Sequence, residues 1–317
     1  MNQTIDKKRI LIFLILAFGI AWAGGLVVFI TGGMADSPVI AGNLTLATVL
    51  IAVVYMWAPA LANILTRVTT HEGWKNNWLK PNFKKGWLLW LAAWVLPGVL
   101  TILGAAQFFA LFPQYFDSNL TTVKQILDSA GWTERGLTPW MLIGIQVVQG
   151  ILISPLINGF FTFGEEFGWR GYLLQKLMPL GSRKAVLLSG VIWGVWHWPV
   201  IAMGHNYGLD YTGAPWLGML MMVWFTIVMG VFLSWVTLRG GSVWPAVIGH
   251  AAINGIAGLG SLFVKSTPNP LFGPLPVGII GSIGFALAAG WILASKNGLK
   301  SVVEIPPVEP VSNETVL

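Results

Sequence analysis

The sequence predicts an all-α, polytopic membrane protein with about eight transmembrane helices around a polar cavity inside the membrane. Of its 317 residues, 55% are hydrophobic and only 9% are charged, and the mean hydropathy is +0.72. This composition is typical of a chain whose surroundings are largely lipid. Polar side chains nevertheless recur within the later apolar runs, and such residues usually face the interior of a helix bundle. These observations together predict the fold class.

Eight apolar runs come near or exceed the length of about 20 residues that a helix needs to cross a bilayer. They cover residues 10–30, 44–66, 87–112, 140–163, 185–203, 216–238, 243–263 and 277–294. The first run is long and lacks a small-residue cleavage site, so we expect it to remain as a span. Residues 1–300 are therefore predicted to form one transmembrane domain, with a motif core at about 155–260. The proline-containing segment 301–317 is predicted to be a disordered cytoplasmic tail.

Two segments fit this scheme less simply. Residues 139–178 are too long for one span, and Pro155 is expected to break or kink them, so that the true fourth span begins later. Residues 115–130 place Leu120, Val123 and Leu127 at helical spacing and predict a short helix on the outer surface.

The basic residues are distributed as orientation signals. With eight spans, most lysines and arginines fall before the first span, in alternate connections and after the last span. The opposite connections hold Lys124, Arg135 and Lys265. Basic residues mark the cytoplasmic side of a membrane protein, so we expect a multi-pass protein of the cell membrane with both termini in the cytoplasm. The net charge of +6 is explained in this way, and no nucleic-acid partner is predicted.

Two adjacent acids, Glu165 and Glu166, end a long apolar run. A charge inside a bilayer costs roughly 2.5–3.5 kcal/mol on insertion scales, and two neighbouring charges also repel each other, so such a pair indicates a function. Arg170 follows Glu166 by four residues, in the order that favours an ion pair on a helix. Catalysis and ion transport are both compatible with the pair.

Histidines are predicted to lie near this pair. Glu165 and His197 are each 16 residues from Gly181, in the predicted turn between two helices, so they are expected to face each other across a hairpin. His250 and Asn254 share a helix face. His250 lies on the order of 10 Å into its span, compared with about 24 Å for Glu165, so a tilted helix or a backbone that dips into the membrane at Gly240 would have to close the gap.

Three motifs in this order resemble those of a known family. The sequence from Glu165 to Arg170 fits EExxxR, the sequence from Trp193 to His197 is similar to FxxxH, and the sequence from His250 to Asn254 fits HxxxN. The chain thus resembles the CPBP (CAAX protease and bacteriocin-processing, or Abi) intramembrane proteases, which include the type II CAAX prenyl endopeptidases. Trp193 stands where the family usually has phenylalanine. We expect this change to alter packing without a loss of chemistry.

The resemblance implies a peptide hydrolase that acts on a membrane-associated or lipidated polypeptide. Glu165 would be the base that activates water, and His197 would help to hold that water or a metal. Glu166 would support the site and pair with Arg170, while His250 and Asn254 would stabilise the oxyanion. A zinc ion held by Glu165, His197 and His250, or no metal at all, are both compatible with the sequence.

Each motif residue also has a purely structural interpretation. The acidic pair can be an ion-pair staple with Arg170, His197 a hydrogen-bonded core histidine, and His250 with Asn254 a polar link between helices. Gly190 and Gly194 are expected to allow close helix packing. Two other functions stay open: a non-proteolytic scaffold or bacteriocin self-immunity protein, and a proton-coupled transporter. The absence of repeated halves argues against the transporter.

Overall fold

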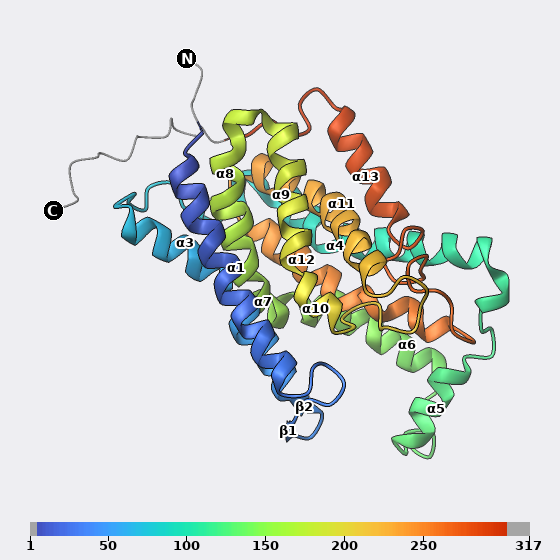
Figure 1. The fold of residues 1–317 in the computed structure, drawn as a ribbon. Coiled ribbons are helices and arrows are strands. Elements are labelled where there is room, and N and C mark those ends of the chain that lie inside the picture. Colours follow the sequence, from blue (N-terminus) through green and yellow to red (C-terminus); the bar gives the residue numbers. More distant parts are fainter. Residues whose placement is uncertain (1–4, 303–317) are drawn as a thin grey trace.

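The computed structural model describes residues 5–302 and consists almost entirely of helices (Figure 1). The α-helices are α1 (Lys7–Ile30), α2 (Leu46–Leu50), α3 (Ala58–Thr69), α4 (Phe83–Leu111), α5 (Thr121–Ser129), α6 (Pro139–Val148), α7 (Ser154–Gly168), α8 (Leu174–Leu177), α9 (Ser182–Trp196), α10 (Trp198–Ala202), α11 (Trp216–Gly240), α12 (Trp244–Ile256) and α13 (Ile283–Ala294). Three π-helical segments, η1 (Ile51–Tyr55), η3 (Gln149–Ile153) and η4 (Trp169–Leu173), and three 3₁₀ turns, η2 (Pro113–Tyr115), η5 (Met178–Leu180) and η6 (Ala257–Phe263), join them. One small antiparallel hairpin, β1 (Val39–Ala41) with β2 (Leu44–Thr45), follows α1.

The all-α membrane architecture is confirmed. Six apolar helical runs in the described part of the chain are long enough to cross a bilayer: Lys7–Ile30, Leu46–Thr69, Gly86–Leu111, Pro139–Leu180, Trp216–Gly240 and Trp244–Phe263. The fifth and eighth predicted spans are shorter helices. The fifth is divided at His197 into α9 and α10, and α13 begins only at Ile283. In Figure 1 the start of α1, the turn from α8 to α9 and the end of α13 lie at the same end of the bundle.

The helical run that carries the acidic pair is continuous over 42 residues. At 1.5 Å per residue a straight helix of this length would measure about 63 Å, twice the hydrocarbon core of a bilayer. The run changes direction instead, and Figure 1 shows α6 and α7 pointing different ways. The π-helical segment η3 lies between them, just before Pro155, which lies in the first turn of α7 where its missing N–H is tolerated. Residues 139–180 therefore form one bent run, and the proline ends no helix.

Small residues bring α9 against α11. A β-carbon added at Gly190 would come within 2.8 Å of the Ile227 Cα, and one added at Gly194 would come within 2.5 Å of the Val223 Cα. The Thr226 hydroxyl donates to the Gly190 carbonyl at 3.0 Å across the same contact. The two glycines thus permit close packing, as their spacing predicted.

A buried turn sets the depth of α12. Gly240, Gly241, Ser242 and Val243 are all buried, so the backbone enters the protein interior before α12 begins. The Val243 amide donates to the Trp78 carbonyl at 3.0 Å. This inward turn is the second of the two ways in which His250 was expected to reach the level of the glutamates.

The loop before α4 caps this turn. The Asn82 side-chain amide donates to the Gly241 carbonyl at 2.7 Å, and the Trp244 indole donates to the Leu79 carbonyl at 2.7 Å. Trp78 is only 6% exposed. The loop thus folds inward over α12.

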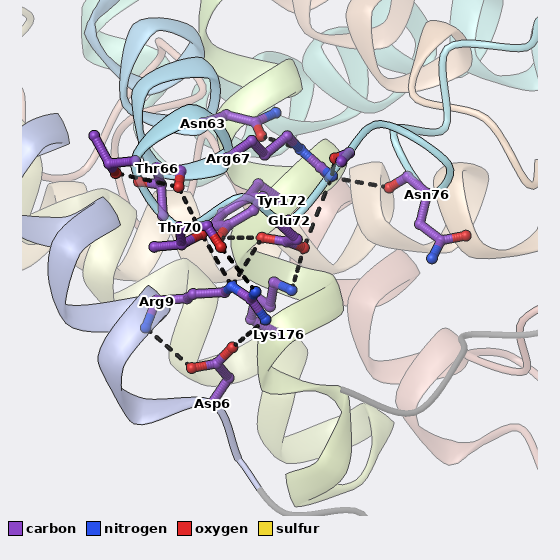
Figure 2. A network of polar contacts seen from close by, with 12 residues as sticks. Asp6, Arg9, Asn63, Thr66, Arg67, Thr70, Glu72, Asn76, Tyr172 and Lys176 are labelled. Atoms are coloured by element: carbon purple, nitrogen blue, oxygen red, sulfur yellow. Dashed lines mark hydrogen bonds and ion pairs between the residues drawn. The ribbon is translucent and has the colours of Figure 1, made fainter. Parts of the chain in front are cut away.

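A cluster of charged residues joins α1 and α3 to the helical run that carries the acidic pair (Figure 2). Glu72, in the loop after α3, accepts a hydrogen bond from the Tyr172 hydroxyl at 2.8 Å and forms an ion pair with Lys176. Arg9 of α1 and Arg67 of α3 approach the same carboxylate at 3.5 and 3.8 Å. We call these five residues the Glu72 cluster. Apart from Arg67, these partners lie far from Glu72 along the chain, so no local sequence pattern predicts the cluster.

The predicted helix within residues 115–130 is present as α5. Leu120, Val123 and Leu127 are buried and form a separate small core with Leu142 and Ile143 of α6. The Asp117 carboxylate accepts the Thr121 amide at 2.7 Å and the Asn119 amide at 2.9 Å, which caps the start of the helix.

A buried carboxylate and histidine site

Glu166 is the centre of the site. Its Oε1 atom accepts hydrogen bonds from Arg170 Nη1 and His250 Nδ1, each at 2.9 Å. The Glu166 side chain is 0% exposed and that of Arg170 is 1% exposed. The predicted pairing of Glu166 with Arg170 is therefore present. The contact with His250 shows that α12 brings its histidine to the level of the acidic pair.

Glu165 faces a different neighbour. Its Oε2 atom accepts a hydrogen bond from the Trp193 indole Nε1 at 2.8 Å, and the residue is 3% exposed. Trp193 belongs to α9, so this bond joins the two helices of the hairpin whose residue count placed Glu165 and His197 at equal depth. Because Oε2 is held by the indole, Oε1 is the oxygen that is left to interact with a reacting molecule.

His197 lies at the end of α9, where the helix gives way to α10. Its Nδ1 atom is 2.9 Å from the Trp193 carbonyl oxygen. A carbonyl can only accept, so Nδ1 carries the hydrogen and Nε2 presents a lone pair in the neutral ring. The ring is half-buried and packs edge-on against Trp196 at 4.8 Å between centroids. Glu165 and His197 thus both contact Trp193.

Trp193 connects the three motifs. The Arg170 guanidinium lies over its ring at 4.4 Å from the centroid, a cation–π contact. The His250 ring meets the same indole edge-on at 5.3 Å. Together with the bond to Glu165 and the proximity of His197, these contacts make Trp193 the residue on which the site converges. The sequence indicated only a large aromatic side chain here, and the role of its N–H depends on distances that sequence spacing cannot supply.

The remaining polar residues lie away from the carboxylates. Asn254 is one turn beyond His250 and is exposed, and its side chain makes no hydrogen bond to another residue that the structure describes. The Thr162 hydroxyl donates to the Val247 carbonyl at 3.0 Å, and the Asn158 amide donates to the Ser154 hydroxyl at 2.6 Å. Thr162 therefore links α7 to α12. The role of Asn254 as an oxyanion donor stays a prediction.

The donor set differs from the zinc site that the sequence allowed. Within residues 5–302, no three His, Cys, Asp or Glu side chains are close enough together to hold a metal ion. Glu165, His197 and His250 as placed do not fit a three-ligand site. The proposed reaction therefore uses only protein side chains.

Fold and site define a class: a polytopic helical membrane protein with a buried pair of carboxylates, one bonded to arginine and histidine and the other to an indole. Residues 135–256, which contain all three motifs, match the family model described as type II CAAX prenyl endopeptidase Rce1-like. This match supports the resemblance of the motif region to the CPBP/CAAX proteases. The chain is also similar to CAAX prenyl protease 2 of Methanococcus maripaludis, with 33% identity over 93 residues, which cover 28% of this chain and 34% of the relative. The match thus spans about a third of that relative's length.

Proposed function

We propose that this protein is an intramembrane endopeptidase that hydrolyses a membrane-associated polypeptide with water activated by Glu165. The single observation that carries the proposal is the division of labour in the acidic pair. Glu166 is committed to Arg170 and His250, whereas Glu165 has one oxygen held by Trp193 and the other left for water. A purely structural staple would use both carboxylates as counter-ions.

The reaction follows from these positions. Glu165 Oε1 takes a proton from water while the water oxygen attacks the carbonyl carbon of the peptide bond. His197 Nε2 accepts a hydrogen bond from the same water and orients it. When the tetrahedral intermediate collapses, the C–N bond breaks and the proton held by Glu165 passes to the leaving amine. Carboxylic acid and amine are the products, and Glu165 is ionised again.

His250 and Asn254 are proposed to donate to the oxyanion of the intermediate. His250 Nδ1 is bonded to the Glu166 carboxylate, so Nε2 can donate only when both ring nitrogens carry hydrogen. Glu166 is then the hydrogen-bond partner that orients the ring of the residue proposed to stabilise the transition state.

The name of the relative suggests the substrate to examine first. A prenylated peptide that ends in a CAAX sequence, presented in liposomes, is the natural probe, with the same peptide lacking the lipid as its comparison. The start of α1 and the end of α13 lie at the same end of the bundle, and we propose that this end faces the cytoplasm.

The test is the Glu165→Gln variant, reconstituted in proteoliposomes and assayed by mass spectrometry of the peptide products. We expect the wild-type protein to cleave the probe and the variant to lose at least about a hundredfold in rate, because general-base catalysis contributes roughly 10²–10⁴-fold. Glu134→Gln, at an exposed loop position, is the matched control and should retain full activity. Cleavage by Glu165→Gln at the wild-type rate would exclude Glu165 as the base. If cells that carry Glu165→Gln or His197→Ala keep the wild-type phenotype, a non-proteolytic scaffold is favoured.

A further inference from the structure

Trp193 has a hydrogen-bonding role that the usual phenylalanine at this motif position cannot perform. Phenylalanine shares the aromatic ring but has no N–H group. In this chain the indole Nε1 donates to Glu165 Oε2 at 2.8 Å, and the donor residue is only 2% exposed. Water has little access to compete for this bond, and an N–H bond to an ionised carboxylate in such surroundings is among the stronger hydrogen bonds in proteins.

We propose that Trp193 is a positioning residue for Glu165, which holds the carboxylate ionised and directs its second oxygen toward the reacting water. The inference rests on the proposed function of Glu165, and it adds a residue to the machinery of that site. It also replaces the expectation that the tryptophan changes packing alone.

The surroundings of the indole favour this role. The Arg170 guanidinium lies over the ring face, and this cation withdraws electron density from the indole and strengthens its N–H as a donor. Arg170 is bonded at the same time to Glu166. A chain of contacts thus runs from Glu166 through Arg170 and Trp193 to Glu165. The two carboxylates are held apart by a cation and an aromatic ring, which reduces their mutual repulsion.

The orientation of Glu165 follows from the same geometry. The helical run that carries it and α9, which carries Trp193, form a hairpin, so a bond between them fixes the side-chain torsions of Glu165 relative to His197. His197 is anchored through Nδ1 to the carbonyl of the same tryptophan. One residue therefore sets the position of the base through its side chain and the position of the histidine through its backbone.

The experiment removes the N–H group and leaves the ring. Replacement of Trp193 by benzothienylalanine through genetic code expansion substitutes sulfur for the indole nitrogen and retains ring size, packing and the contact with Arg170. Trp193→Phe is the simpler companion variant, at the cost of ring volume. Trp224→Phe is the matched control, because its indole also donates to one side chain, Ser282 Oγ at 2.9 Å, and lies on α11 away from the carboxylates.

The first readout does not require catalysis. A pH titration by difference infrared spectroscopy follows the C=O band of protonated Glu165, identified as the band that Glu165→Gln lacks. A hydrogen bond to the ionised form favours that form, so its removal should move the midpoint of this band to higher pH by about one pH unit or more. The groups that interact with Glu165 are unchanged by the replacement: Glu166, Arg170, His250 and Tyr55.

The second readout is kinetic. With the prenylated peptide, kcat should fall roughly tenfold or more while KM changes little, and the acidic limb of the pH–rate profile should move to higher pH in parallel with the infrared midpoint. Trp224→Phe should leave both the midpoint and kcat as in the wild type.

The possible results separate the two proposals. A benzothienylalanine protein with the wild-type midpoint and the wild-type kcat would overturn the positioning role, even if Glu165→Gln is inactive. If the midpoint is shifted in the benzothienylalanine protein and the wild-type protein cleaves no peptide, the positioning role is supported and the proposed function is overturned. A lower melting temperature with an unchanged midpoint would show that Trp193 contributes packing only, and that too would overturn the proposal.

Discussion

At the residue scale, Glu166 and Glu165 should differ in what their loss costs. Glu166→Gln leaves the buried Arg170 charge without its carboxylate, and removing one partner of a buried ion pair typically costs about 3–5 kcal/mol of folding free energy. Glu165→Gln retains an oxygen that accepts from Trp193 and should cost far less stability. We expect a marked fall in melting temperature in detergent for Glu166→Gln and a small one for Glu165→Gln.

Activity should rank the same two variants in the opposite order. At equal amounts of folded protein, Glu165→Gln should reduce peptide cleavage more than Glu166→Gln does, because only Glu165 is proposed to take the proton from water. Scanning fluorimetry and the liposome assay on the same preparations measure both quantities. Equal melting temperatures for the two variants would contradict the assignment of Glu166 as the structural member of the pair.

At the element scale, the contact between α9 and α11 depends on the absence of a side chain at Gly194. The β-carbon of alanine would lie 2.5 Å from the Val223 Cα and 2.6 Å from the Thr226 Oγ1, and the first of these is backbone that cannot move aside. Gly194→Ala should therefore force the helices apart and destabilise the protein by about 1–3 kcal/mol or more. Because α9 also carries Trp193, peptide cleavage should fall together with the melting temperature.

Gly290→Ala provides the comparison within a helix. No atom lies within 4 Å of an added β-carbon at this exposed position of α13. Since glycine inside a helix costs roughly 0.5–1 kcal/mol relative to alanine, this substitution should raise the melting temperature slightly. If both glycine variants had the same effect on stability, helix propensity and not close packing would govern Gly194.

The same scale shows which features were accessible from sequence alone. Periodicity is local, so the apolar runs, the i, i+4 pair of Glu166 and Arg170, and the small residues of α9 could all be predicted. Contacts between distant segments could not. The buried turn before α12 is stabilised by Trp78, which is more than 160 residues earlier in the chain. No local pattern distinguishes this tryptophan from the exposed Trp87 nine residues later.

At the scale of the whole molecule, the segment that matches the family model is only part of the folded unit. Residues 135–256 supply every motif residue, yet α7 packs against α3, and α12 packs against α4. The loop before α4 also caps the turn that places His250. Helices and loops between residues 5 and 134 thus hold the site in place without contributing a motif to it.

The Glu72 cluster is where this dependence can be measured. The Glu72 side chain is 14% exposed and faces Arg9, Arg67 and Lys176, which belong to three separate helices. Glu72→Gln would leave these three cations close together without the carboxylate that they share, although Arg9 keeps its ion pair with Asp6. We expect the variant to lose about 2–4 kcal/mol of folding free energy, somewhat less than a fully buried pair because the carboxylate keeps partial access to solvent. Glu134→Gln, which removes the same charge from an exposed loop, should leave the melting temperature unchanged.

Since Tyr172 and Lys176 follow the acidic pair on the same helical run, limited proteolysis should show the Glu72→Gln protein cleaved between α3 and α4 before any other loop. If Glu72→Gln melts at the same temperature as Glu134→Gln, helix packing alone joins α1 and α3 to the helical run that carries the acidic pair.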